Sequence, residues 1–265
     1  MRTLLLTSVF FLAAGPSMAG AASSSESAAQ PALPPITPPE GFTVSVFHPG
    51  LGATRHIAVR DNGDVYVARS FRLERKMFGQ AAAWGAIVAL RDEDGDGVAD
   101  IVTPFGPTDV TTEVRIHDEH LYFSSDQVVY RMALDDNLVP QTVGEPLAGG
   151  FPMTGSHGTK TLAFDNAGNM YVNSGVPTNN CEIKRMTKAS PGMDPCPFLE
   201  RSGGIWKFSD DELNQDQVRD GERYITGTRN IVAMAWNPWV DKLFFVMHGR
   251  DAIGMTWPDY YTRED

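Results

Sequence analysis

Four aspartates at alternating positions form the densest set of metal-ligating residues in the sequence. Asp92, Asp94, Asp96 and Asp100 occupy positions 1, 3, 5 and 9 of a glycine-containing loop, and the carbonyl of Val98 falls between the last two. Calcium prefers several hard oxygen ligands at flexible geometry, and this spacing wraps carboxylates around one point. The sequence therefore predicts a structural calcium site in this loop. The alternative is a solvated acidic hairpin tip.

A histidine between two glycines is the strongest candidate for acid–base chemistry. His157 lies within residues 155–160, whose sequence is GSHGTK, directly before an expected strand. The glycines allow a ligand to approach closely, and imidazole suits proton transfer near neutral pH. In a propeller such loops line the mouth of the central channel. A lone histidine is more often a surface or packing residue, so both interpretations stay open at this point.

The N-terminus predicts export from the cytoplasm. Arg2 precedes an apolar run at residues 4–14, and small residues at 17–19 offer a cleavage site. This run is too short to span a bilayer, so we expect a signal peptide at 1–19 and no membrane span. Residues 20–39 are rich in Ala, Ser and Pro and are expected to form a disordered linker. The folded domain is expected at 40–265, in a periplasmic or secreted protein.

Export also bears on the cysteines and on the charge. Cys181 and Cys196 flank a segment rich in proline and glycine turns, and in an oxidising compartment the sequence favours a disulfide over two free thiols. The formal net charge is −11 and becomes more negative when Arg2 is cleaved off. An acidic surface repels polyphosphate, which argues against a nucleic-acid partner.

A repeated hairpin must position these residues. An apolar strand, a polar turn and a second strand with a central aromatic residue recur four times, at 56–59 with 65–68, 114–116 with 121–123, 161–164 with 170–172, and 232–236 with 243–246. Their long spacing fits propeller blades with insertions better than a sandwich. Further strands are expected at 42–47, 84–90, 127–132 and 204–208, and one helical turn at 211–215. The sequence thus predicts an all-β propeller of which this chain holds about four blades, an incomplete ring.

Three stretches together resemble the PQQ (pyrroloquinoline quinone)-dependent soluble glucose/sorbosone dehydrogenases. They are residues 155–164 (GSHGTKTLAF), 226–230 (TGTRN) and 248–251 (HGRD), and they occur in the family's order. Two further segments, 194–197 (DPCP) and 203–206 (GGIW), resemble the sorbosone dehydrogenase branch. This resemblance implies a six-bladed quinoprotein β-propeller with PQQ across the channel mouth.

The resemblance also implies roles for particular residues. His157 matches the general base that removes a hydroxyl proton while hydride passes to the quinone. Arg229 matches the arginine that pairs with the anionic cofactor, and Asn230 matches the amide that binds its quinone oxygens. Gly249 and Arg250 match positions whose carbonyls ligate the calcium that polarises the quinone. Without the resemblance, Arg229 could equally well form a surface ion pair. Asn230 could equally well be a residue that favours a turn.

These features favour an oxidoreductase that oxidises a sugar or sugar aldehyde with PQQ and calcium. The family's further cofactor-holding basic residues come from the last blades, so we expect little activity from these 265 residues alone. The sequence has no CxxCH haem motif, so electrons are expected to leave to an external acceptor. The alternatives are a non-catalytic calcium-stabilised propeller that binds carbohydrate or protein, and a lactonase-type hydrolase.

Overall fold

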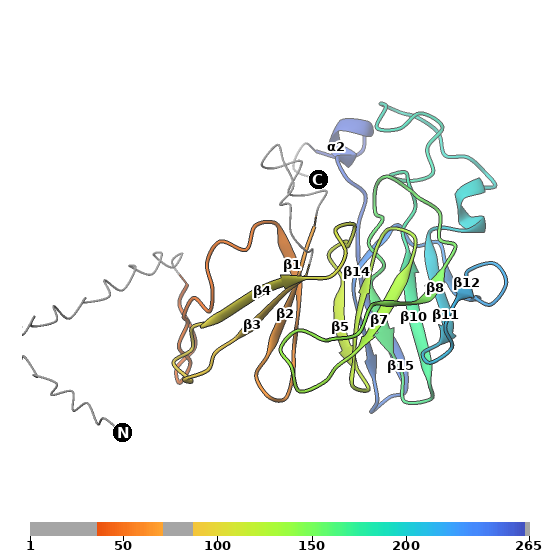
Figure 1. Cartoon of the computed structure of the whole chain (residues 1–265). Helices are drawn as coiled ribbons and strands as arrows, with labels where there is room; N and C mark the ends of the chain where they lie inside the picture. The colour runs from red at the N-terminus through yellow and green to blue at the C-terminus, as the bar shows by residue number, and fades with distance from the viewer. Residues whose placement is uncertain (1–35, 71–86, 263–265) are drawn as a thin grey trace, which may run out of the picture.

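The structure is a computed structural model that describes residues 36–70 and 87–262. Within these ranges nearly all of the regular secondary structure is β-strand, arranged as four mainly antiparallel sheets that follow one another along the chain (Figure 1). The predicted signal peptide, most of the predicted linker and residues 84–86 lie outside the described residues. In the part of the chain that the structure describes, no helix is long and apolar enough to cross a membrane.

Each sheet contains one of the four predicted hairpins. The first sheet has the order β1(Thr54–Val59), β2(Val65–Arg69), β3(Ile87–Arg91) and β4(Ile101–Phe105). The second has β5(Val114–His117), β6(His120–Ser124), β7(Val129–Ala133) and β8(Glu145–Gly149), with β12(Gln215–Asp216) added in parallel to β8. The third has β9(Leu162–Phe164), β10(Asn169–Ser174), β11(Gly204–Ser209) and β13(Glu222–Thr226). The fourth is the pair β14(Asn230–Asn237) and β15(Lys242–His248).

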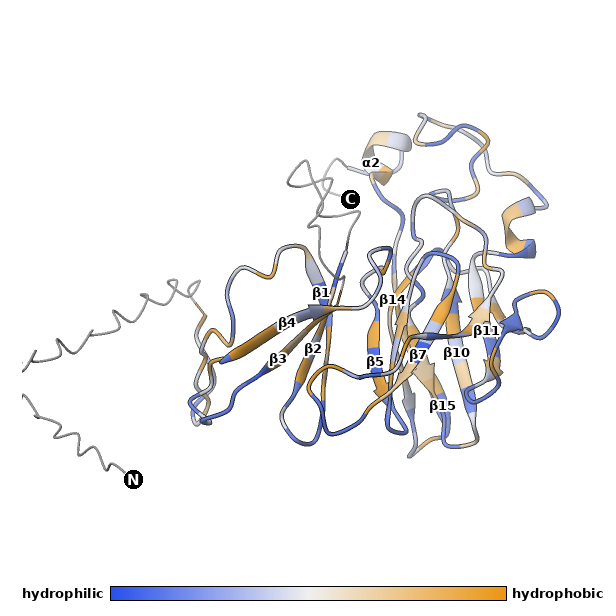
Figure 2. Cartoon of the chain, in the orientation of Figure 1, coloured by the Kyte–Doolittle hydropathy of each residue, from blue (hydrophilic) through white to orange (hydrophobic). Residues whose placement is uncertain are grey.

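The sheets pack face to face because successive side chains on a strand point to opposite faces. On β6, Leu121 and Phe123 join the core shared with the first sheet, whereas Tyr122 joins the core shared with the third. Tyr171 on β10 turns the other way and packs with Ile231 and Met234 of the fourth sheet. Hydrophobic residues accordingly gather on the strands and hydrophilic residues on the turns (Figure 2). The two middle sheets therefore bury both faces, as propeller blades do.

The first strands of the four sheets lie innermost and contact one another. β1 contacts β5, and β9 contacts β14. His56 on β1 also lies 3.2 Å from the carbonyl oxygen of Val232 on β14, through its Nε2 atom. The start of each inner strand is thus brought toward a common centre, which is where the candidate site lies.

Several sequence-based predictions of local structure were wrong. Residues 42–47 form no strand, because their alternating pattern meets no partner edge among the described residues. Phe42 is 70% exposed, and the Phe47 carbonyl accepts a backbone hydrogen bond from Ala99. Residues 211–215 form no helical turn, and β12 begins at Gln215 instead. The 3₁₀ helix Pro197–Glu200 and helix α2 (Ile253–Thr256) were not predicted.

The strands β4 and β8 were also missed, and both contain a proline. Pro104 lies in β4 and Pro146 in β8. Proline removes a ladder donor and is confined to edges of sheets, so it weakens a strand signal in the sequence. β4 is an edge strand, and β8 is covered only by the two residues of β12. These prolines are therefore compatible with the observed sheets.

Candidate functional site

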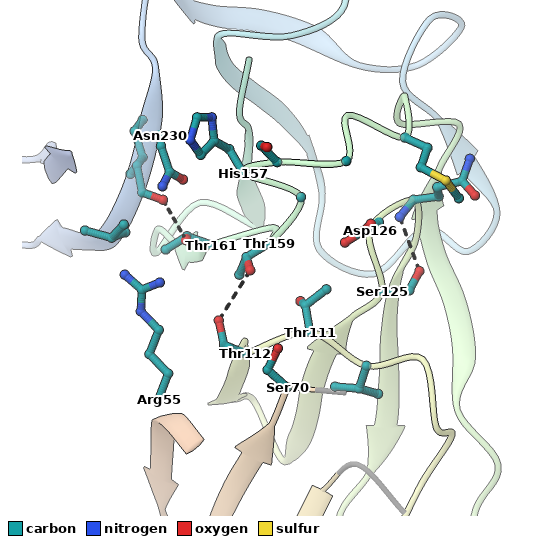
Figure 3. Close-up of a pocket in the computed structure, with 18 of the residues that line it drawn as sticks. Arg55, Ser70, Thr111, Thr112, Ser125, Asp126, His157, Thr159, Thr161 and Asn230 are labelled. Carbon is teal, nitrogen blue, oxygen red and sulfur yellow. Dashed lines mark hydrogen bonds between the residues drawn. The ribbon is translucent and has the colours of Figure 1, made fainter. Parts of the chain in front are cut away.

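A cavity of about 600 Å³ opens where the inner strands begin (Figure 3). The first sheet contributes His56, and the segment before β5 contributes Thr111 and Thr112. The loop before β9 contributes His157, and β14 contributes Asn230. All four sheets thus supply residues to one cavity, and the predicted base and the predicted amide share it.

Glycines hold the loop around His157 in place. His157 has a left-handed backbone conformation with φ 57°. A Cβ atom at Gly158 would lie 2.3 Å from Oδ1 of Asp126, and one at Gly175 would lie 2.6 Å from the Cβ atom of His157. Lys160, which is fully buried, donates a hydrogen bond of 2.7 Å to the Gly158 carbonyl. A larger residue at Gly175 would therefore displace the histidine, whereas one at Gly158 would displace the Asp126 side chain.

The Val176 carbonyl fixes the orientation and tautomer of His157. Nδ1 of His157 lies 2.6 Å from this oxygen. A carbonyl only accepts hydrogen bonds, so Nδ1 carries the proton and Nε2 keeps its lone pair. Burial lowers the pKa of His157, and the positive charge of Arg229 lowers it further, while the Val176 carbonyl opposes both. The side chain is therefore a neutral imidazole near pH 7, able to accept a proton at Nε2.

Arg229 lies directly behind Val176. The Val176 amide donates a hydrogen bond of 2.9 Å to the Arg229 carbonyl, so one residue binds both His157 and Arg229 through its backbone. The Arg229 guanidinium forms an ion pair with Asp251 through Nη2. Asn179 holds Asp251 in turn, by hydrogen bonds of 2.7 and 2.8 Å with its backbone. Asp251 therefore belongs to the site, although the sequence assigned it no role.

Two buried polar atoms near Arg229 lack partners. Nε of Arg229 and Oγ1 of Thr228 are buried with no hydrogen-bond partner among the described residues. Both residues line a second cavity of about 330 Å³, together with Gly249, Arg250 and the cysteines. A buried donor without a partner is costly, which favours a polar ligand at this place.

The structure thus divides the predicted site residues between two cavities. His157 and Asn230 line the larger one, whereas Arg229, Gly249 and Arg250 line the smaller one. Asp251 connects the two, because it lines the larger cavity and pairs with Arg229. Cys181 and Cys196 form the predicted disulfide at the wall of the smaller cavity, with a Cα–Cα distance of 6.0 Å.

A buried charged group beside the larger cavity was not found from the sequence. Glu113 is fully buried, and its Oε2 atom lies 2.6 Å from Nδ1 of His56. Its Oε1 atom accepts hydrogen bonds from Nε of Arg115 at 3.0 Å and from the Leu162 amide at 3.3 Å. These residues come from three different sheets, so no local sequence pattern could reveal the cluster.

The acidic loop lies between β3 and β4, away from both cavities. Carboxylate oxygens of Asp92, Asp94 and Asp100 lie within 4.8 Å of one another. Asp96 is outside this group and accepts a hydrogen bond of 2.8 Å from the Val98 amide. Hydrogen bonds from backbone amides, that of Gly97 first, lower the pKa of Asp92. The structure therefore brings together three of the four predicted carboxylate ligands.

Comparisons with known proteins identify the fold. Neither protein-family models nor curated proteins match the sequence. Among solved structures, the holo form of the pyranose dehydrogenase PQQ domain from Coprinopsis cinerea is similar, with a TM-score of 0.59 and 16% identity over 78% of this chain and 46% of that one.

Two structures of the Trichoderma reesei Carbohydrate-Active Enzymes Family AA12 protein are also similar. The iodide structure has a TM-score of 0.59 and 16% identity over 78% of this chain and 48% of that one. The calcium structure has a TM-score of 0.56 and 16% identity over 77% of this chain and 47% of that one. The chain thus spans about half the length of the solved structures it matches. Its fold is the β-propeller of these proteins, as the sequence predicted, and the described residues form three blades and a two-stranded part of a fourth.

Proposed function

We propose that this chain forms part of a periplasmic or secreted dehydrogenase that oxidises a sugar or sugar aldehyde with PQQ and calcium. The observation that carries the proposal is the shared backbone contact of His157 and Arg229 with Val176, which sets a neutral base beside a buried cation. One of the proteins with the same fold is described as the PQQ domain of a pyranose dehydrogenase.

The residues at the smaller cavity fit an anionic, planar cofactor. The Arg229 guanidinium is planar and permanently charged, which suits carboxylates by both charge and shape. Its buried Nε and the buried hydroxyl of Thr228 have no partner among the described residues and would gain one from such a ligand. When bound, PQQ supplies the acceptor for the two electrons of an alcohol or aldehyde oxidation.

His157 would act as the general base. Its Nε2 would accept the proton of the substrate hydroxyl, while Nδ1 keeps its proton on the Val176 carbonyl. The lowered pKa keeps the ring neutral, and therefore competent, down to slightly acidic pH. Asn230 lines the same cavity, and its amide would orient the ligand's oxygens.

Calcium would bind at the smaller cavity through backbone oxygens. Gly249 and Arg250 directly follow β15, and both line this cavity. Carbonyl oxygens are ligands that calcium accepts readily. Because calcium takes six to eight oxygens, the two carbonyls would provide part of the coordination and the cofactor another part.

The lining of the larger cavity suits a polyhydroxylated substrate. Hydroxyl side chains from four segments line it, including Ser70, Thr111, Ser125 and Thr159 (Figure 3). The hydroxyls of Thr112 and Thr159 lie 3.3 Å apart and connect the second and third sheets. Such side chains both donate and accept hydrogen bonds, as sugar hydroxyls do.

The test reconstitutes the full-length protein with PQQ and calcium. We expect PQQ to bind, and aldoses to drive reduction of a dye. Asparagine tolerates a left-handed backbone, so the variant His157→Asn should keep the loop and bind PQQ as well as wild type. Its kcat should fall by roughly 10²- to 10⁴-fold, the usual effect of losing a general base.

The matched control is His120→Asn, at the first residue of β6 and outside both cavities; it should keep full turnover. Failure of the wild-type protein to bind PQQ would contradict the proposal. Sugar binding without any PQQ binding would favour the non-catalytic carbohydrate-binding alternative. Unchanged turnover in His157→Asn would refute the assignment of the base.

A further inference from the structure

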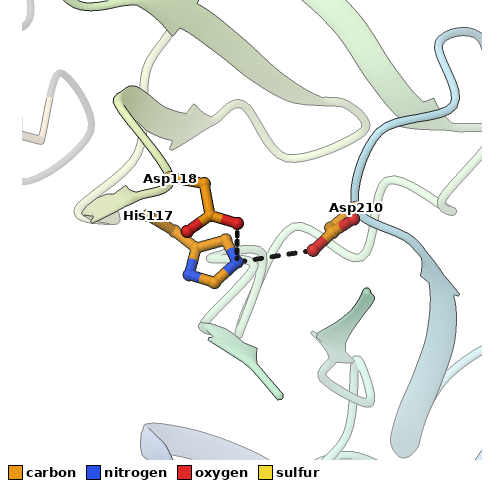
Figure 4. Close-up of side chains that lie close together, drawn as sticks. All are labelled: His117, Asp118 and Asp210. Carbon is orange, nitrogen blue, oxygen red and sulfur yellow. Dashed lines mark hydrogen bonds and ion pairs between the residues drawn. The ribbon is translucent and has the colours of Figure 1, made fainter. Parts of the chain in front are cut away.

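Three metal-ligating side chains converge at the opposite end of the inner strands from the cavities. His117 is the last residue of β5, Asp118 begins the turn that follows, and Asp210 follows β11 in the third sheet. Their side chains point toward one another (Figure 4). None of the three lines either cavity. The cluster therefore needs an explanation of its own.

The distances within this cluster are long for hydrogen bonds and fit a shared cation. Nε2 of His117 lies 3.4 Å from Oδ2 of Asp210 and 3.5 Å from Oδ2 of Asp118. Both separations exceed the usual length of an N–H···O hydrogen bond, about 2.7–3.2 Å, so the contact with Asp210 is at most a long, weak hydrogen bond. Ligands about 2.1 Å from a tetrahedral zinc ion lie about 3.4 Å apart. The imidazole nitrogen thus lies at a metal-ligand separation from each carboxylate, and all three ligand atoms lie within 4.8 Å of one another.

Packing fixes two of the three ligands before any ion binds. The His117 ring stacks on Phe164 at a centroid distance of 4.3 Å, with the ring planes 12° apart. The Asp210 carbonyl accepts hydrogen bonds from Nη1 of Arg131 at 3.2 Å and from the Tyr122 hydroxyl at 3.5 Å. The side chains of His117 and Asp210 are 22% and 14% exposed, whereas that of Asp118 is 84% exposed. An ion would therefore enter from the Asp118 side, onto two ligands already in position.

The donor set selects the class of metal. Imidazole nitrogen with carboxylate oxygen suits zinc and related divalent transition metals, whereas calcium prefers oxygen ligands alone. The acidic loop at Asp92 has only oxygen donors and so differs in kind. The net charge of −11 further favours cation binding anywhere on the chain.

We propose that His117, Asp118 and Asp210 form a zinc-class metal site that links the second and third sheets. Its ligands come from the β5–β6 turn on one side and from the end of β11 on the other. An ion bound there connects two neighbouring blades at the end remote from the cavities. The site is structural, and it does not depend on the proposed cofactor or reaction.

The test measures zinc binding by the full-length protein, without PQQ, by titration calorimetry. Wild type should bind one zinc ion at this site, and zinc should raise its melting temperature. His117→Phe keeps an aromatic ring to stack on Phe164 but removes the nitrogen ligand. Asp210→Asn keeps the shape of the side chain and removes its charge. Each variant should lose at least 10-fold in zinc affinity and lose the thermal shift.

The matched control is Asp211→Asn, which changes the neighbouring carboxylate, outside the cluster. It should bind zinc as wild type does. Excess calcium should leave zinc binding at this site unchanged. The proposal is overturned if wild type binds no zinc, or if His117→Phe and Asp210→Asn bind it as tightly as the control. Asp210→Asn decides the question by itself if the other variant does not fold.

Discussion

The two cavities on either side of Val176 differ in chemistry although one peptide segment holds both. The larger has hydroxyl side chains and a neutral histidine, whereas the smaller has a buried arginine and the disulfide. The carbonyl of Val176 fixes His157, and its amide fixes the backbone of Arg229. The proposed base and the proposed cofactor ligand are therefore coupled through one peptide segment. This segment also keeps Arg229 close enough for its charge to lower the pKa of His157.

Arg229→Gln is expected to have the largest effect on PQQ affinity and a much smaller effect on kcat, which separates the two cavities. This change removes the charge that faces the smaller cavity and leaves Asp251 without its ionic partner. Charge-assisted hydrogen bonds contribute about 1.5–3 kcal/mol, so PQQ affinity should fall by roughly 10- to 150-fold. At saturating PQQ, kcat should fall much less than in His157→Asn. A titration of each variant with PQQ, followed by turnover at saturation, measures both values.

The two variants should not be interchangeable. A large loss of kcat with unchanged PQQ affinity in Arg229→Gln would mean that the smaller cavity is not the cofactor site. Weakened PQQ binding in His157→Asn, with normal turnover at saturation, would mean that the larger cavity holds the cofactor and that His157 is not the base.

Removing the disulfide should affect mainly the smaller cavity. Cys181 and Cys196 line it and close a loop with a sequence separation of 15 residues. In the chain-entropy model such a cross-link stabilises the fold by about 3 kcal/mol. Cys181→Ala with Cys196→Ala should lower the free energy of unfolding by up to this amount and weaken PQQ binding. Denaturant titration measures the first effect. Equal stability of the oxidised wild type and the double variant would contradict it.

The smallest effect is expected from the acidic loop, which lies outside both cavities. If calcium binds there, Asp94→Asn with Asp100→Asn should reduce the calcium-dependent rise in melting temperature by a few degrees and leave PQQ affinity unchanged. Asp96→Asn is the matched control, because the structure places this carboxylate outside the cluster. Calorimetry with and without chelator checks both variants. A larger effect of Asp96→Asn would show that the ligands follow the sequence spacing rather than this geometry.

The hairpins could be predicted from the sequence because their signal is local. Alternating residues such as Tyr66 and Val67 mark strands whose two faces pack on different neighbours. The same alternation predicted a strand at residues 42–47 that the structure does not show. A strand also needs a partner edge, which only the whole fold supplies. Phe244 has the sequence position of a core aromatic residue, yet it is 55% exposed on the two-stranded fourth sheet.

The candidate site was predictable only where its residues are neighbours in the sequence. His157 stands out between glycines, and Arg229 and Asn230 are adjacent. The Val176 carbonyl that orients His157 lies 19 residues away in the sequence, and a carbonyl leaves no side-chain signal. The Glu113 and His56 pair joins the residue before β5 to β1 of another sheet, which no spacing rule connects. Tertiary structure, rather than local pattern, supplies these partners.

The pH dependence of kcat/KM tests the central claim most directly. A histidine with a lowered pKa loses its base function only when the pH falls through that lowered value, so activity should be retained with rising pH and lost below it. With the PQQ-loaded protein, we predict that the acid limb has an apparent pKa below 6.5, the ordinary value for histidine. Arg229→Gln, measured at saturating PQQ, should move the limb upward, because a nearby positive charge is lost. An acid limb above 6.5 in wild type, or one that persists unchanged in His157→Asn, would contradict the account.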